Sequence, residues 1–158
     1  MEGYDVAQVC PNGHVANDSS TKFPQFNRDF CEDCGEKTIT SCPSCKNPIR
    51  GRLGGGFSCA EFTPPAYCRN CGNAFPWTQQ KIQAAIDLAV EVGGLQGDDK
   101  TQFDNSIREI VRDTPQTQLA AHRVKGLMEK MANSAGSAIR DIVVDITSEV
   151  AKKIIWPS

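Results

Sequence analysis

The stretch Phe30-Cys31-Glu32-Asp33-Cys34-Gly35 returns later in the chain as Tyr67-Cys68-Arg69-Asn70-Cys71-Gly72. A third C-x-x-C pair, Cys42-Pro43-Ser44-Cys45, lies between the two copies. A fourth half-site precedes them as Cys10-Pro11-Asn12-Gly13-His14, with histidine in place of the second cysteine. Two-residue spacing lets both side chains of one turn face a single metal ion, and glycine after the second cysteine suits a left-handed turn. The four half-sites therefore predict metal-binding knuckles.

Four half-sites supply the ligands of two tetrahedral ions, and their order favours pairing neighbours. The first ion would be held by Cys10, His14, Cys31 and Cys34, and the second by Cys42, Cys45, Cys68 and Cys71. Residues 15–30 and 46–67 would then link the two knuckles of each site, which is the arrangement of a zinc ribbon. Pairing the first half-site with the third and the second with the fourth would give a RING-like cross-brace, and this alternative stays open.

We expect the two ions to be structural zinc. Both sets close at four protein ligands, whereas a catalytic zinc leaves one coordination position for water. The deaminase signature H-x-E is missing, because Val15-Ala16 follow His14. Reactive dithiols and iron–sulfur ligation are the alternatives, but three C-x-x-C pairs with one C-x-x-x-H favour zinc. The sequence thus predicts a protein that is not an enzyme.

The composition changes near residues 76–77. All 8 cysteines of the 158-residue chain lie between Cys10 and Cys71. A stretch this small rarely stabilises a core without metal or disulfides. We predict a small α+β protein with two domains, a double zinc ribbon of short β-hairpins over residues 1–76 and an α-helical region over 77–158.

The helical region is expected to contain four segments. The first opens at Trp77-Thr78 and ends at Gly93-Gly94, and the second carries the stripe Phe103, Ile107, Ile110 and Val111. The third would have Thr114 as its cap and Pro115 as its first residue. The last would run from Ser137 to Trp156, with its apolar face at Ile139, Ile142, Val143, Ile146, Val150 and Ile154. The β-branched run 142–147 leaves a strand open as an alternative. We expect this last helix to contact a protein partner or a second copy of the chain.

Residues 10–72 resemble the double zinc ribbon class. The opening Gly3-Tyr4-Asp5-Val6-Ala7-Gln8-Val9-Cys10, the following Asn12-Gly13-His14-Val15 and the tail Ala138-Ile139-Arg140-Asp141-Ile142 are more particular. Together they are similar to an uncharacterised bacterial family of small zinc-ribbon proteins. That resemblance covers nearly the whole chain. It implies a bacterial cytosolic setting and no activity.

The polar residues outside the knuckles point to a second function. Lys46, Arg50, Arg52 and Arg69 make the loop of the second ribbon basic, so these four are candidate nucleic-acid contacts. Residues 1–77 hold 7 basic and 8 acidic residues, however, and two zinc–thiolate centres would bring them to about −4. Nucleic-acid modules are normally basic. The first hypothesis is therefore a non-enzymatic adaptor or scaffold, and nucleic-acid binding is the alternative.

Two further expectations concern the thiols and the setting of the chain. Cys59 is left over from the paired half-sites, and we expect it to be a half-buried apolar residue. No apolar run approaches the ~20 residues of a membrane-spanning helix. The first residues also lack the regions of a signal peptide. We expect a cytoplasmic protein, where paired thiols are more often metal ligands than disulfides.

Overall fold

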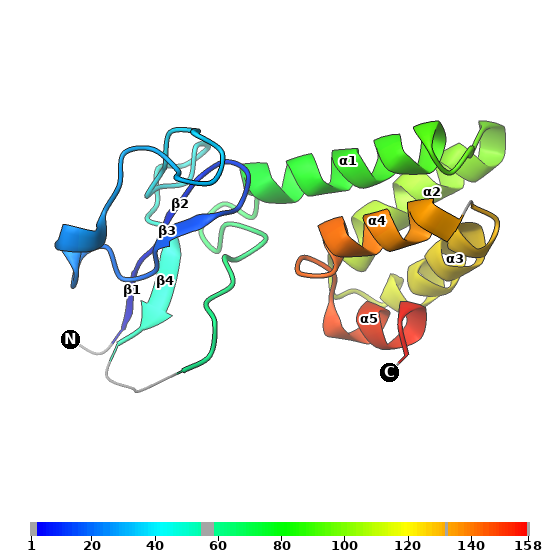
Figure 1. Cartoon of the computed structure of the whole chain (residues 1–158). Helices are drawn as coiled ribbons and strands as arrows, with labels where there is room; N and C mark the ends of the chain where they lie inside the picture. Colours follow the sequence, from blue (N-terminus) through cyan, green and yellow to red (C-terminus); the bar gives the residue numbers. More distant parts are fainter. Residues whose placement is uncertain (1–2, 55–58, 132, 158) are drawn as a thin grey trace. The chain divides into compact units, whose positions relative to one another are not determined.

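The chain forms two compact units, which meet between Gln79 and Gln80. The computed structural model describes residues 3–54, 59–131 and 133–157 (Figure 1). The first unit contains short strands and the cysteines, and the second contains helices. This agrees with the predicted small α+β class, with tandem ribbons before a helical region. The predicted domain boundary, after residue 76, lies at the start of helix α1 (Pro76–Glu91).

The strands of the first unit form two small antiparallel sheets. In one, β1 (Tyr4–Val6) pairs with β4 (Arg50–Leu53), and in the other, β2 (Gln8–Val9) pairs with β3 (Val15–Asn17). A short 3-10 helix, η1 (Pro24–Phe26), follows β3. The first knuckle lies in the turn of the β2–β3 hairpin. By contrast, β4 pairs with β1, which lies far from it in sequence near the start of the unit.

Strand β4 corrects the expectation of a basic loop over residues 46–52. Arg50 and Arg52 belong to a strand, and Gly51 between them is buried. A Cβ atom on Gly51 would lie 2.4 Å from the carbonyl oxygen of Asp18. Because side chains alternate along a strand, burying Gly51 against the backbone turns both arginines to the other face. The sequence predicted a basic loop here, but close backbone packing at Gly51 holds residues 50–53 in a strand.

The core of the first unit is small and includes two of the cysteines predicted to bind metal. Its buried members are Ala7, Val9, Cys42, Ile49, Cys68, Phe75 and Trp77. The rings of Phe75 and Trp77 stack with centroids 4.6 Å apart. Trp77 Nε1 also donates a hydrogen bond of 2.9 Å to the carbonyl oxygen of Pro65. The first turn of α1 therefore packs with the second ribbon, which is why the first unit extends past residue 76.

The second unit packs the remaining helices around an aliphatic core. After α1 come α2 (Gly97–Ile110), α3 (Thr117–Glu129), α4 (Asn133–Val143) and α5 (Glu149–Ile155), and α3 packs against both α2 and α5. The four residues of the predicted second stripe are all buried. Helix α3 begins later than predicted, with Gln116 as its N-cap. The reason is that Thr114 Oγ1 accepts a hydrogen bond from the Gln116 N–H (3.1 Å), forming a turn before the helix.

The predicted last helix is broken into α4 and α5. Thr147 Oγ1 donates to the Val143 carbonyl oxygen (2.6 Å), and the Ser148 N–H donates to the carbonyl oxygen of Ile110 in α2 (2.9 Å). Ser148 then caps α5 by accepting a hydrogen bond from the Ala151 N–H. The β-branched run lowers helix propensity at this point, and a cap follows directly. Neither the continuous helix nor a strand forms here.

Because of this break, several of the C-terminal apolar residues are buried within the unit and are not exposed to a partner. Ile139, Val143 and Ile146 are buried within the unit, while Val150 is 37% exposed. Half of the face expected to meet a partner is thus buried within the unit, and Ile142 and Ile154 are partly buried. Among the described residues, no helix combines the length and the apolar character needed to cross a membrane.

Candidate metal centres

Three knuckles of the first unit share one hydrogen-bonded turn. In each, the N–H of the first cysteine donates to the carbonyl oxygen five residues later, and the N–H four residues later donates back to that cysteine. The first cysteines are Cys31, Cys42 and Cys68, and these bonds are 2.8–2.9 Å long. The residue after the second cysteine has a left-handed φ, which is 78° at Gly35, 77° at Gly72 and 66° at Lys46. Local sequence alone thus shapes the knuckle, and Lys46 occupies a glycine position.

The histidine knuckle is a variant of the same turn. The Cys10 N–H donates to the carbonyl oxygen of His14 (3.0 Å), and the Gly13 N–H returns to the carbonyl oxygen of Cys10 (2.9 Å). Gly13 supplies the left-handed φ of 93°. The extra residue places the imidazole of His14 where the second thiol of the other knuckles stands.

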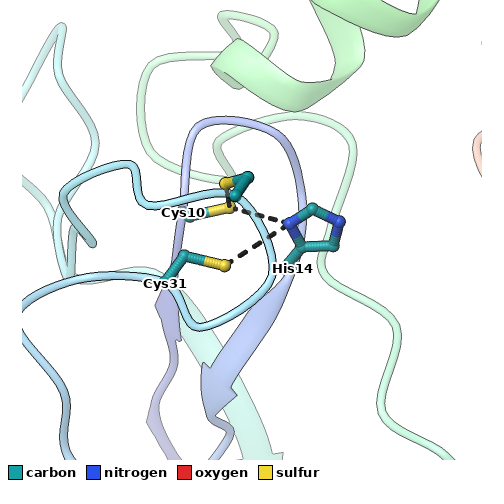
Figure 2. A group of neighbouring side chains, drawn as sticks. Cys10, His14 and Cys31 are labelled. Atoms are coloured by element: carbon teal, nitrogen blue, oxygen red, sulfur yellow. Dashed lines mark hydrogen bonds between the residues drawn. The ribbon is translucent and has the colours of Figure 1, made fainter.

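The first centre brings Cys10, His14, Cys31 and Cys34 together, with all four ligand atoms within 4.8 Å of one another. His14 Nδ1 lies 3.4 Å from Cys10 Sγ and 3.5 Å from Cys31 Sγ (Figure 2). Cys10 Sγ lies 3.7 Å from Cys34 Sγ. A tetrahedral ion with metal–sulfur bonds of ~2.3 Å and a metal–nitrogen bond of ~2.05 Å requires about 3.8 Å between sulfurs and about 3.6 Å from sulfur to nitrogen. The geometry therefore fits one tetrahedral ion.

The second centre has the same dimensions. It brings together Cys42, Cys45, Cys68 and Cys71. Cys42 Sγ lies 3.8 Å from Cys71 Sγ, and Cys45 Sγ lies 3.7 Å from Cys68 Sγ. Disulfide bonds would need about 2.05 Å. All four sulfurs lie within 4.8 Å of one another, which is too close for a polynuclear iron–sulfur cluster, whose thiolates are spread over separate irons. Both centres group neighbouring half-sites, so the structure has the ribbon pairing and not the cross-brace.

One asparagine links the two knuckles within each centre. Asn12 Nδ2, from the first knuckle, donates to Cys34 Sγ across the first centre (3.2 Å). Asn70 Nδ2, from the last knuckle, donates to Cys45 Sγ across the second (3.4 Å). Each asparagine lies two residues after the first cysteine of its knuckle. The sequence-based prediction used only the spacing of the ligands, so it did not identify this shared position. The amides stabilise thiolate charge, as groups around metal ligands commonly do.

The thiols of the two centres differ in pKa, because the amides lower some of the values and burial raises others. The Asn12 side chain is the main cause that lowers the pKa of Cys34 to about 6, and the Asn70 side chain likewise lowers the pKa of Cys45 to about 6. Burial raises the pKa of Cys10 to about 11. The lowered pKa favours the thiolate form of Cys34 and Cys45, whereas the raised pKa of Cys10 favours its protonated form.

The remaining cysteine belongs to neither centre. Cys59 is exposed, so the expectation that it would be half-buried is wrong. It follows the undescribed residues 55–58 and stands in a segment without helix or strand. An apolar character predicts burial only where the side chain reaches a core, and here Phe62 of the same segment packs against the core while Cys59 does not.

The four basic candidates do not form one surface of free cations. Arg52 pairs with Asp18, with Nε and Nη2 each 2.8 Å from Oδ2. The guanidinium carbons of Arg50 and Arg69 lie 5.1 and 5.5 Å from the ring centroid of Tyr4. Lys46 is exposed at its knuckle. Tyr4 is far from these residues in sequence, and no local pattern linked it to them.

A family model described as "Uncharacterized protein conserved in bacteria (DUF2321)" matches residues 3–155. Neither the curated proteins nor the solved structures gave a match. The match confirms the resemblance to an uncharacterised bacterial family.

Proposed function

This chain belongs to the bacterial family DUF2321, and we propose that it is a non-enzymatic zinc-binding adaptor that holds another protein or a second copy of itself. Zinc is the ion proposed for both centres. Three thiolates with one imidazole, and four thiolates, are the closed ligand sets typical of structural zinc. With four protein ligands each, the proposed ions have no position left for water or substrate, which supports a structural role.

The observation that carries the adaptor proposal is a loop of exposed phenylalanines. Every residue from 21 to 30, here called the phenylalanine loop, is exposed. Phe23, Phe26 and Phe30 are 41%, 57% and 61% exposed. A phenylalanine side chain can bury about 150–250 Å². Three of them in one short loop therefore offer roughly 300 Å² of apolar surface, the size of a typical interaction patch.

Buried polar side chains form hydrogen bonds with the backbone of this loop and fix its position. Asn17 Nδ2 donates to the carbonyl oxygen of Phe23 (2.9 Å), and Gln8 Oε1 accepts from the Arg28 N–H (2.9 Å). Thr38 Oγ1 donates to the carbonyl oxygen of Arg28 (2.6 Å). Asn17, Gln8 and Thr38 are at most 9% exposed. Their bonds fix the backbone while its aromatic side chains face solvent.

A carboxylate fixes the start of the same loop. Asp5 accepts hydrogen bonds of 3.0 Å from the N–H groups of Thr21 and Lys22. Burial acts to raise the pKa of Asp5, but the bonds from Thr21, Val6 and Lys22 outweigh it and lower the pKa. A loop ordered before binding loses less conformational entropy when a partner arrives. This preorganisation supports a binding role for the phenylalanines.

The C-terminal helices are the second surface considered for a partner or a homo-oligomer. Their exposed apolar residues are fewer than the sequence predicted, with Val150 at 37% exposure. The phenylalanine loop therefore carries the proposal, and any contact through α4 and α5 would be smaller.

The experiment replaces Phe23, Phe26 and Phe30 with serine in the full chain. Sedimentation velocity measures self-association, and chemical cross-linking in the bacterial cell followed by mass spectrometry identifies partner contacts. We expect the triple variant to lose the self-association or the cross-links while it retains both ions. Leu119→Ser is the control, because Leu119 is 47% exposed in the helical unit. Unchanged assembly and cross-links in the triple variant would reject this surface.

Nucleic-acid binding through Lys46, Arg50, Arg52 and Arg69 is the alternative function. Its support is that Arg50 and Arg69 lie together beside an exposed tyrosine. A complex held by phosphate contacts would weaken steeply as salt rises. Protein binding releases counterions from the nucleic acid, and this release is less favourable when the salt concentration is high. We expect no binding to duplex DNA at physiological salt, measured by fluorescence anisotropy. Tight, salt-sensitive binding that Arg50→Gln weakens would favour the alternative.

A further inference from the structure

Two arginines from distant parts of the first unit meet at one tyrosine. Arg50 comes from β4 and Arg69 from the last knuckle, and both guanidinium carbons lie within 5.5 Å of the Tyr4 ring centroid. Tyr4 is 49% exposed, so this cluster is open to solvent. The ring face is negative and attracts both cations, which positions them without neutralising their charge.

Neither arginine has an acidic partner among the described residues. Within residues 3–54, 59–131 and 133–157, no carboxylate oxygen lies within 4.0 Å of the Arg50 or Arg69 guanidinium. Arg52, which lies on the same strand as Arg50, differs because Asp18 pairs with it. Two neighbouring guanidiniums without counter-charge give a local positive potential on a unit that is otherwise slightly acidic.

Two hollows adjoin the cluster and share Arg50. The smaller, of about 100 Å³, is lined by Arg50 and Arg69 together with apolar residues of the second ribbon. The larger, of about 440 Å³, is lined by Tyr4, Leu53 and Phe62 as well as Arg50. Its volume is at the lower end of the range for ligand pockets. An apolar hollow therefore opens beside unpaired positive charge.

We propose that Tyr4, Arg50 and Arg69 bind an acidic protein segment whose one large apolar side chain enters the larger hollow. Carboxylates would pair with the two guanidiniums, whose planar donor groups suit carboxylate oxygens. The apolar side chain would cover Leu53 and Phe62. This inference rests on the proposed adaptor function, since it names the chemistry of one partner segment.

The charge of the unit favours a protein segment over a nucleic acid. Residues 1–77 carry one more acidic than basic residue, and the thiolate centres add further negative charge. Glu61 also lines the larger hollow. A nucleic acid carries a phosphate at every nucleotide, so some of its phosphates would lie close to these negative groups and be repelled by them. A peptide with a few carboxylates can place them at the two arginines only.

The test measures binding of a labelled peptide to the full metal-loaded chain by fluorescence anisotropy. The probe has one phenylalanine flanked on each side by two glutamates, and a second peptide has glutamine at those four positions. We expect saturable binding of the acidic probe in the micromolar range, at least about tenfold tighter than the glutamine peptide. Arg50→Gln and Arg69→Gln should each weaken it about threefold to tenfold. Tyr4→Phe should retain it, because the ring remains, whereas Tyr4→Ala should weaken it. Lys37→Gln, at an exposed site on the same unit, is the charge-matched control.

Each contrary outcome has a distinct meaning. Equal binding of both peptides, no saturable binding up to millimolar probe, or equal loss in Lys37→Gln would overturn the proposal. Tighter binding of a 12-nucleotide oligothymidine at the same arginines would replace the protein segment with a nucleic acid. Loss of metal from Arg50→Gln and Arg69→Gln without a change in probe binding would mean that they only balance thiolate charge. The adaptor function would survive these results if the phenylalanine-loop variant still abolished assembly or partner contacts.

Discussion

The amide groups of Asn12 and Asn70 should each strengthen one metal centre and leave the other unchanged. Asn12 Nδ2 lies 3.2 Å from Cys34 Sγ in the first centre, and Asn70 Nδ2 lies 3.4 Å from Cys45 Sγ in the second. Hydrogen bonds to charged groups contribute about 1.5–3 kcal/mol when sheltered. Cys34 is exposed, so solvent screens this hydrogen bond and its effect on metal affinity should lie at the weak end for a bond to a charged group. Asn12→Ala should then weaken zinc binding at the first centre about fivefold to tenfold.

Asn12→Asp is a sharper change because it keeps the size of the side chain. The donor becomes a carboxylate oxygen beside a thiolate at the same 3.2 Å. Two like charges this close repel each other even in bulk water. Added to the lost hydrogen bond, this repulsion should weaken the first centre by about fiftyfold to a hundredfold.

Competition with a chromophoric zinc chelator measures both affinities, and cobalt substitution distinguishes a three-sulfur, one-nitrogen centre from a four-sulfur one. Asn73→Ala is the control, because the exposed Asn73 contributes its backbone to the last knuckle. Wild-type affinity in Asn12→Asp would refute the reasoning. Equal weakening of both centres by a single variant would refute it as well, since each amide touches one centre.

Three other expectations concern the turns, the helical unit and the loop. Lys46→Gly should stabilise the second ribbon by about 0.5–1 kcal/mol, because a left-handed φ costs a non-glycine residue more than glycine loses in chain entropy. Gly35→Lys should have the opposite effect on the first ribbon, and denaturation of the metal-bound protein measures both. Ile146→Asp buries a charge, so circular dichroism should show loss of the helical unit while both ions stay bound, and Val150→Asp should leave the helices intact. The carboxylate of Asp5 stabilises the phenylalanine loop above its ordinary pKa of 3.8, and this contribution should disappear as the pH falls through the lowered value. Hydrogen exchange at residues 21 and 22 checks this, with Asp5→Ala, which has no acceptor, giving fast exchange at every pH.

The positions of the metal ligands could be predicted from the sequence because a knuckle is a local object. Its hydrogen bonds join residues within five positions, and its left-handed residue follows the second ligand at once. The helical stripes were predictable for the same reason, since 3.6-residue periodicity needs no knowledge of the partner surface. The break in the C-terminal helix could not be predicted in this way. It depends on the hydrogen bond from the Ser148 N–H to the carbonyl oxygen of Ile110, which lies in another helix.

The sequence by itself determined four metal-binding turns and a helical region after them, since both follow from interactions between near neighbours. Only the tertiary structure decided which turns face one another, because spacing allowed a ribbon and a cross-brace alike. It also decided that β4 pairs with β1, and this pairing brings Arg50 to Tyr4. The exposed phenylalanines follow the same logic. Their type predicts burial, but three buried polar side chains hold their loop outside a core too small to receive it. Contacts between distant residues depend on how the whole chain packs, and no local pattern records them.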